Sequence, residues 1–124
     1  VKLRILDITG CIIAGSASPD TKAAYVAALD TFPGDDGRVL GYAAGTSLAG
    51  AALVNGTAAL VLEFDDSHLE SASHLGSPVI AAALPLAIHR NLSGTRLIES
   101  VAAGLEHREA LGGAGRRDHR SRRQ

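Results

Sequence analysis

Residues 47–64, SLAGAALVNGTAALVLEF, decide the fold of this chain of 124 residues. Alanine and leucine predominate, Ser47 stands before the apolar run, and no charged residue occurs between Arg38 and Glu63. Alanine has the highest helix propensity, and a serine before a helix accepts a hydrogen bond from its first turn. The stretch therefore predicts a long helix that begins after Ser47 and is buried on all sides in a helical bundle.

A membrane span is the alternative for the segment between Arg38 and Glu63, because residues 39–62 are uncharged and numerous enough to cross a bilayer. Its glycines, serine and threonines, the central Asn55, and the lack of flanking aromatic anchors or a basic cluster favour a soluble protein instead. The only cysteine, Cys11, lies in apolar sequence, which is typical of a small buried side chain in a reducing compartment. No N-terminal signal pattern is visible, so we expect a cytoplasmic protein without membrane association.

Further helices are predicted on both sides of this stretch. Residues 2–15 carry Leu and Ile at helical spacing and end at Gly15. Residues 18–32 form a second predicted helix, which Ser18 or Asp20 would cap and Pro33-Gly34 would terminate. Between them and the central helix, we expect one short extended piece around Val39 and Leu40.

The last two helices have their own start signals. Ser77-Pro78 places a capping hydroxyl before a proline at the first helical position, and Pro85 should kink the helix that follows. Ser93-Gly94 then separates it from an amphipathic helix over residues 95–111. The predicted fold class is therefore all-α, a helical bundle of about five helices packed through Ala and Gly.

The charge of the chain is divided unevenly. Residues 1–107 contain six Lys or Arg and eleven Asp or Glu, a balance of −5, whereas residues 108–124 contain six Arg and two acids, a balance of +4. We therefore predict a helical domain over residues 1–108 and an Arg-rich, disordered tail over residues 109–124.

Acidic and imidazole groups gather where the central helix ends, in LVLEFDDSHLESASHLGSP, residues 60–78. On a helix ending near residue 66, Glu63 would share one face with Asp66 and Ser67, which lie three and four positions away. Carboxylates at a helix C-terminus oppose the helix dipole, which indicates a functional site or a cationic partner. The alternative is that Asp65 or Asp66 caps the following turn.

His74 lies in the loop just before a predicted helix N-terminus. An imidazole there is suited to proton transfer near neutral pH, although a loop histidine can also be simply exposed. Gly76 would let a substrate approach the backbone, and the helix N-terminus at Ser77 would favour an anion. A metal site is a further alternative, and its ligands would be Asp65, Asp66, His68 and His74. These residues match no standard metal-site spacing, so we expect no metal.

Three segments in order resemble the amino-terminal helical domain of the MmgE/PrpD family, which includes 2-methylcitrate dehydratase and cis-aconitate decarboxylase. They are AALVNGTAALVLEFDDSH (51–68), HLGSPVIAAALPLAIHRNLSG (74–94) and VAAGLEHR (101–108). The family shows an Asn-Gly in a buried helix, a DFDDTH-like motif, a His that opens a small-residue helix, and Ser-Gly before another helix. The resemblance covers roughly residues 3–108.

The resemblance implies a lyase without a cofactor that dehydrates or decarboxylates small di- or tricarboxylic acids, as a homodimer, with an α/β domain after the helical one. Its active-site positions correspond here to Glu63, Ser67 and His74. His74 would transfer a proton or bind the substrate, Ser67 would donate a hydrogen bond to a substrate carboxylate, and Glu63 would orient one of them. Substrate binding is expected of three neighbours: Asp66, Gly76 and Ser77.

This chain departs from the family pattern at several points. Glu63 stands for the usual Asp, Ser67 for the usual Thr, and the proline that often follows His74 is absent. Family enzymes are several times longer, and the end of this chain, REALGGAGRRDHRSRRQ, looks like sequence from a shifted reading frame. We therefore expect a truncated lyase fragment that is inactive alone.

A helical interaction module is the alternative function. Its Arg-rich tail would bind nucleic acid or an acidic partner. The tail has no aromatic residue on which a base could stack, so nucleic-acid binding is not expected.

Overall fold

The computed structural model describes residues 1–67 and 74–121, with side chains described as far as residue 110. Within these residues it contains five helices and an isolated antiparallel bridge between Gly37 and Thr46, close to the extended piece expected around Val39 and Leu40. The predicted all-α class is confirmed. In chain order the helices are α1 (Lys2–Gly15), α2 (Pro19–Thr31), α3 (Leu48–Leu60), α4 (Gly76–His89) and α5 (Gly94–Ser121).

Serine hydroxyls cap three of the helices, two of them at positions predicted from the sequence. Ser18 Oγ accepts from Asp20 N at 3.2 Å, and Ser47 Oγ accepts from Gly50 N at 3.3 Å. Ser93 Oγ likewise accepts from Arg96 N at 3.3 Å. These bonds satisfy N–H groups that a helix leaves without partners in its first turn.

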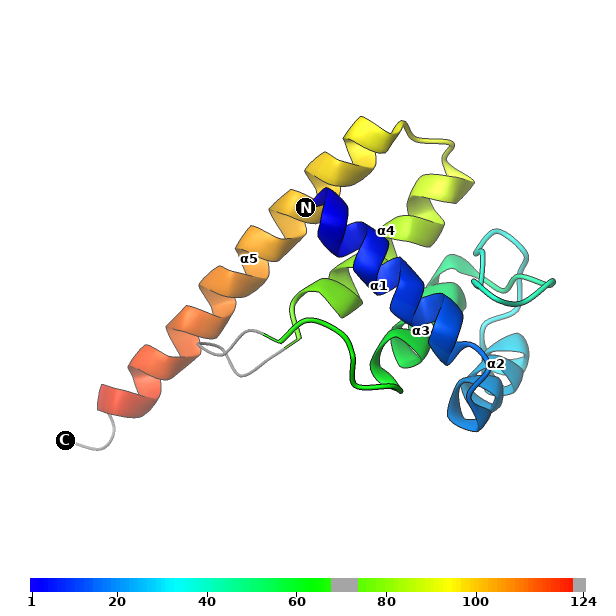
Figure 1. Cartoon of the computed structure of the whole chain (residues 1–124), viewed down its shortest axis with the longest axis horizontal. Helices are drawn as coiled ribbons and strands as arrows, with labels where there is room; N and C mark the ends of the chain where they lie inside the picture. Colours follow the sequence, from blue (N-terminus) through cyan, green and yellow to red (C-terminus); the bar gives the residue numbers. More distant parts are fainter. Residues whose placement is uncertain (68–73, 122–124) are drawn as a thin grey trace.

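The central helix α3 packs against α1, α2 and α4, while α4 also packs against α5 (Figure 1). Its small side chains allow this close contact: Ala51, Ala58 and Ala59 are fully or almost fully buried. At the crossing with α1, the backbone of Gly15 approaches the Ala58 carbonyl so closely that a Cβ atom at Gly15 would overlap the oxygen. The main apolar core joins four helices and the residue before α4: Ile8, Ile12, Ala58, Ala59, Leu75, Ile80, Val101 and Leu105.

Asn55 connects α3 to the loop that precedes it. Its side chain is buried, its Nδ2 donates to Arg38 O at 3.1 Å, and its Oδ1 accepts from Leu40 N at 3.0 Å. These two bonds compensate for burying an amide. A polar residue in the middle of α3 is therefore explained by its partners in the loop.

Cys11 is buried on α1, as expected, and its surroundings change its acidity. Burial, followed by the charges of Asp7 and Asp65, raises the pKa of the Cys11 thiol above its ordinary value of 9.0. The neutral thiol is therefore favoured more strongly in the folded chain than in the unfolded one.

We predict that the contribution of Cys11 to the free energy of unfolding is fully present below pH 9.0 and is lost as the pH rises through the raised pKa of the folded thiol. Denaturation of the wild type and of Cys11→Ala, at several pH values on both sides of 9.0, isolates this contribution from other groups. An identical pH dependence in the two proteins would contradict the prediction.

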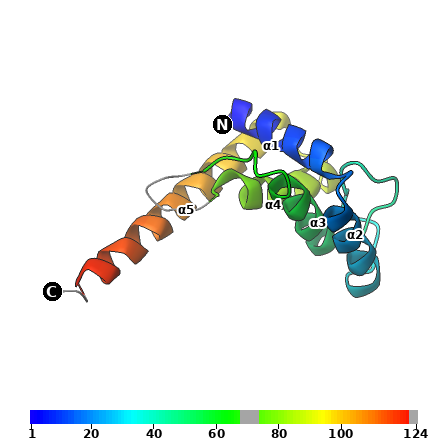
Figure 2. The ribbon, with the colours of Figure 1, turned by 60° about the horizontal axis from the view of Figure 1, so that its bottom comes forward.

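Helix α5 is the longest element, and its C-terminal part extends beyond the other helices in both views (Figures 1 and 2). It crosses the boundary predicted at residue 108 without a break. A continuous helix does not test whether residues 109–124 behave as a separate tail, so that division stays a prediction. Across the part of the chain that the structure describes, no helix combines the length and apolar character of a membrane span.

Candidate active site

The segment after α3 leaves the helical path early. The helix ends at Leu60, and Glu63 adopts a left-handed backbone conformation with a φ of 53°. This conformation is uncommon for a residue other than glycine. The prediction that Glu63, Asp66 and Ser67 share one helix face is therefore wrong, because the chain has turned away before it reaches them.

Asp65 lies at the centre of the site. Its side chain is 0% exposed, and its Oδ2 lies 3.0 Å from His74 Nδ1 and accepts from Ser77 Oγ at 2.5 Å. A buried carboxylate is costly unless such partners surround it. The predicted role of Ser77 as a helix cap is wrong, because α4 already begins at Gly76 and the Ser77 hydroxyl donates to Asp65.

Asp66 occupies the N-terminus of α4. Its two carboxylate oxygens accept from Gly76 N at 2.9 and 3.0 Å, and one of them lies 3.4 Å from Arg4 Nε. A Cβ atom at Gly76 would lie 2.6 Å from this carboxylate, so glycine permits the approach. The helix N-terminus expected to receive a substrate anion thus already binds an anion of the chain itself. Substrate binding by Asp66, Gly76 and Ser77 stays a prediction.

The three residues that the family resemblance implies to be catalytic line one cavity. Its volume is about 490 Å³, and Glu63, Ser67 and His74 lie around it together with Asp65 and Leu60. The structure therefore brings Glu63, Ser67 and His74 together, although not on the helix face that was expected.

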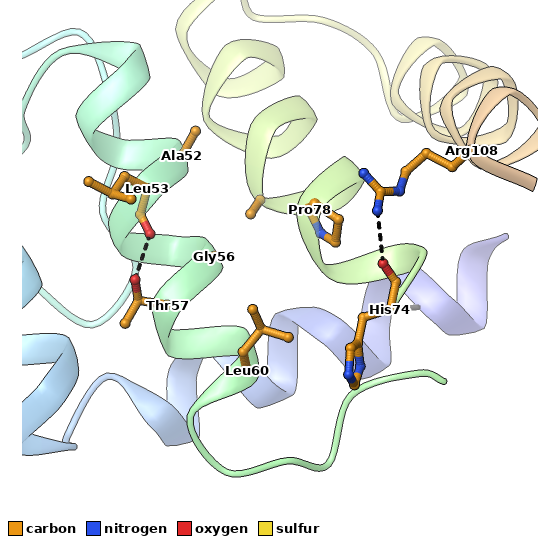
Figure 3. A pocket seen from close by; sticks show the side chains of 9 residues that line it. Ala52, Leu53, Gly56, Thr57, Leu60, His74, Pro78 and Arg108 are labelled. Atoms are coloured by element: carbon orange, nitrogen blue, oxygen red, sulfur yellow. Dashed lines mark hydrogen bonds between the residues drawn. The ribbon is translucent and has the colours of Figure 1, made fainter. Parts of the chain in front are cut away.

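A second cavity, of about 520 Å³, extends from His74 between α3 and α4 (Figure 3). Its walls are mostly apolar, and Pro78 and Leu60 face each other across it. Arg108 of α5 also lines it, and Arg108 Nη2 donates to the His74 carbonyl oxygen at 3.5 Å. Arg108 Nε is buried and has no hydrogen-bond partner among the described residues.

Arg4 and Arg108 are site residues that the sequence reasoning missed. Arg108 entered only the charge balance of residues 108–124 and was given no role in a site, although it ends VAAGLEHR, the third segment of the family resemblance. Arg4 lies 62 positions from its partner Asp66, and no local spacing connects the two.

The metal alternative has four ligands, Asp65, Asp66, His68 and His74. His68 lies outside the described residues. Within residues 1–67 and 74–110, whose side chains the structure describes, no group of three or more His, Cys, Asp or Glu is placed to hold a metal ion.

Comparison with known proteins gives one match. Residues 1–122 match the family profile described as the MmgE/PrpD N-terminal domain. No curated protein and no solved structure matches the chain at a significant level.

Proposed function

The chain belongs to the MmgE/PrpD family, and from this membership we propose that it forms the helical part of a lyase for small di- or tricarboxylic acids. The reaction is a dehydration or a decarboxylation that needs no cofactor. One observation carries the proposal: His74, held by the buried Asp65, lines the same cavity as Glu63 and Ser67.

Each side chain has a role in this proposal. Both reactions need proton transfer next to a carboxylate and stabilisation of the enolate-like charge that develops. His74 transfers the proton, because its imidazole is almost half exposed and lines the cavity. Ser67 donates a hydrogen bond to a substrate carboxylate, and Glu63 orients Ser67 or His74.

The charges of this site explain why we propose that the chain is inactive alone. A substrate with two or three carboxylates requires several cationic partners. Arg4 already pairs with Asp66, which leaves Arg108 as the arginine next to His74 among the described residues. The other cations would come from the α/β domain that follows the helical domain in this family.

We also propose a cytoplasmic homodimer, as the family resemblance implies. Apolar side chains exposed on α1 support an assembled protein, since Leu3 is 81% and Leu6 70% exposed. Light scattering of the purified protein over a range of concentrations tests this, and a monomer mass throughout would contradict it. No observation on the described residues supports the interaction-module alternative, and we do not propose it.

An assay of substrate conversion tests the proposed lyase. Citrate-like hydroxy acids and unsaturated tricarboxylic acids are incubated with the 124-residue chain and with a longer protein that joins it to a family α/β domain. The ultraviolet absorbance of a C=C bond conjugated to a carboxylate reports both reactions. We expect conversion only by the longer protein. Turnover by the chain alone at ordinary enzymatic rates would refute its inactivity, and no conversion by either protein would refute the lyase.

A further inference from the structure

We infer that Asp65 is the positioning residue of His74, holding its imidazole in the tautomer with the proton on Nδ1 and leaving Nε2 to exchange a proton with the substrate. The inference rests on the proposed function for the reaction but on geometry alone for the tautomer. Asp65 is not among the catalytic or substrate-binding residues predicted from the sequence.

The contact between the two side chains sets the tautomer. An ionised carboxylate only accepts hydrogen bonds, so Nδ1, at 3.0 Å from Asp65 Oδ2, carries a proton. In the neutral imidazole Nε2 is then an acceptor, and no described residue donates to it. Because the His74 side chain is 47% exposed and lines both cavities, Nε2 is the ring nitrogen that remains to meet a ligand.

A hydrogen bond from the first turn of α4 holds the Asp65 carboxylate in place. Ser77, which is fully buried in the first turn of that helix, donates to the same Oδ2 that faces His74. The other oxygen, Oδ1, is buried without a hydrogen-bond partner among the described residues. The hydrogen bonds of the carboxylate are therefore concentrated on the oxygen that faces the imidazole.

The His74 backbone is fixed from a third direction. Arg108 of α5 donates to the His74 carbonyl oxygen, as Figure 3 shows, while Asp65 faces the ring. A general base needs this kind of orientation, because small displacements of a reacting group reduce the rate strongly.

The neighbouring carboxylate has a different task. Asp66 binds Gly76 N and Arg4, which stabilises the start of α4 and its contact with α1. Asp65 has no backbone N–H partner among the described residues, and its two partners there are the hydroxyl of Ser77 and the imidazole of His74. If Asp65 had a purely structural role, replacing it would leave the tautomer of His74 unchanged. If Asp65 positions the imidazole, replacing it would change the tautomer, and the tautomer can be measured.

Nitrogen-15 NMR of the histidine-labelled 124-residue chain tests the inference without any substrate. Above the pH at which the imidazoles become neutral, we expect His74 to be mainly in the Nδ1–H tautomer. The exposed His89 and His107 serve as references and should show the Nε2–H tautomer that free histidine prefers. A wild-type His74 in the Nε2–H tautomer would overturn the inference, whether or not any variant folds.

Variants then identify the group responsible. Asp65→Ala should move His74 to the Nε2–H tautomer, whereas Ser77→Ala, which keeps the carboxylate, should leave most of the Nδ1–H tautomer. Asp30→Ala removes an exposed carboxylate on α2 and is the matched control, with no expected change. An unchanged His74 tautomer in folded Asp65→Ala would overturn the inference.

Activity of the longer protein separates this inference from the proposed function. There Asp65→Ala should lower kcat about 10- to 100-fold with little change in KM. If the tautomer behaves as expected but no acid is converted, the lyase proposal fails and the positioning of His74 stands. If acids are converted and Asp65→Ala changes neither kcat nor the tautomer, the positioning role fails alone.

Discussion

Replacing His74 by asparagine is expected to lower turnover about 10²- to 10⁴-fold in the longer protein that carries the family α/β domain. Asparagine keeps an N–H donor near the position of Nδ1, so the contact with the buried Asp65 can persist. It removes Nε2, the nitrogen proposed to exchange a proton with the substrate. Steady-state rates at saturating substrate measure the loss, which should appear in kcat more than in KM.

His89→Asn is the matched control for this experiment. His89 is exposed at the C-terminal end of α4, the helix that His74 precedes, and the same chemical change there should leave the rate unaltered. If His74→Asn retains the wild-type kcat, His74 is not the proton-transfer group.

Replacing Gly15 by alanine is expected to lower the free energy of unfolding by about 3 kcal/mol. The added methyl group would overlap the Ala58 carbonyl oxygen and lie 2.9 Å from Val61 Cγ1. The oxygen belongs to the backbone of α3 and cannot rotate away as a side chain can, so α1 must move off the central helix. Urea denaturation followed by circular dichroism measures the change.

Gly10→Ala makes the same substitution earlier on the same helix. Apart from Gly10 itself, its two chain neighbours and the adjoining backbone of α1, no heavy atom lies within 4 Å of the added methyl group, and Gly10 is exposed. Alanine is favoured over glycine in a helix by about 1 kcal/mol, so this variant should be stabilised. Equal stability of the Gly15→Ala and Gly10→Ala proteins would show that the close approach of α1 and α3 does not limit stability.

The helices could be predicted because their signals are local. Ser18 and Ser47 cap the helices that follow them, and α1 ends at Gly15 as its sequence indicates. Pro85 lies inside α4, which continues to His89, and the kink expected there stays a prediction.

The end of α3 could not be predicted, because its cause is not local. VLEFDDS contains no glycine or proline that would stop a helix. The chain turns at Glu63 because Asp65 and Asp66 find their partners in α4 and α1, which lie far along the chain. Sequence periodicity carries no information about such contacts.

The candidate site was predictable in its residue types but not in its connections. The family resemblance pointed to Glu63, Ser67 and His74, which the structure places around one cavity. Arg4 and Arg108 reach the site only through the packing of α1 and α5. The pairing of Asp65 with His74 and Ser77 likewise appears only once α3 and α4 are folded together.

The distances along the chain between these partners have a consequence for the order of folding. Arg108 binds the carbonyl of a residue 34 positions earlier, and Arg4 pairs with Asp66, which lies 62 positions later in the chain. Contacts that close long loops cost more chain entropy and form later than contacts within a helical hairpin. The helices can therefore pack around α3 before Arg4 and Arg108 form these contacts. A nearly folded molecule would then still lack the contacts that complete its site.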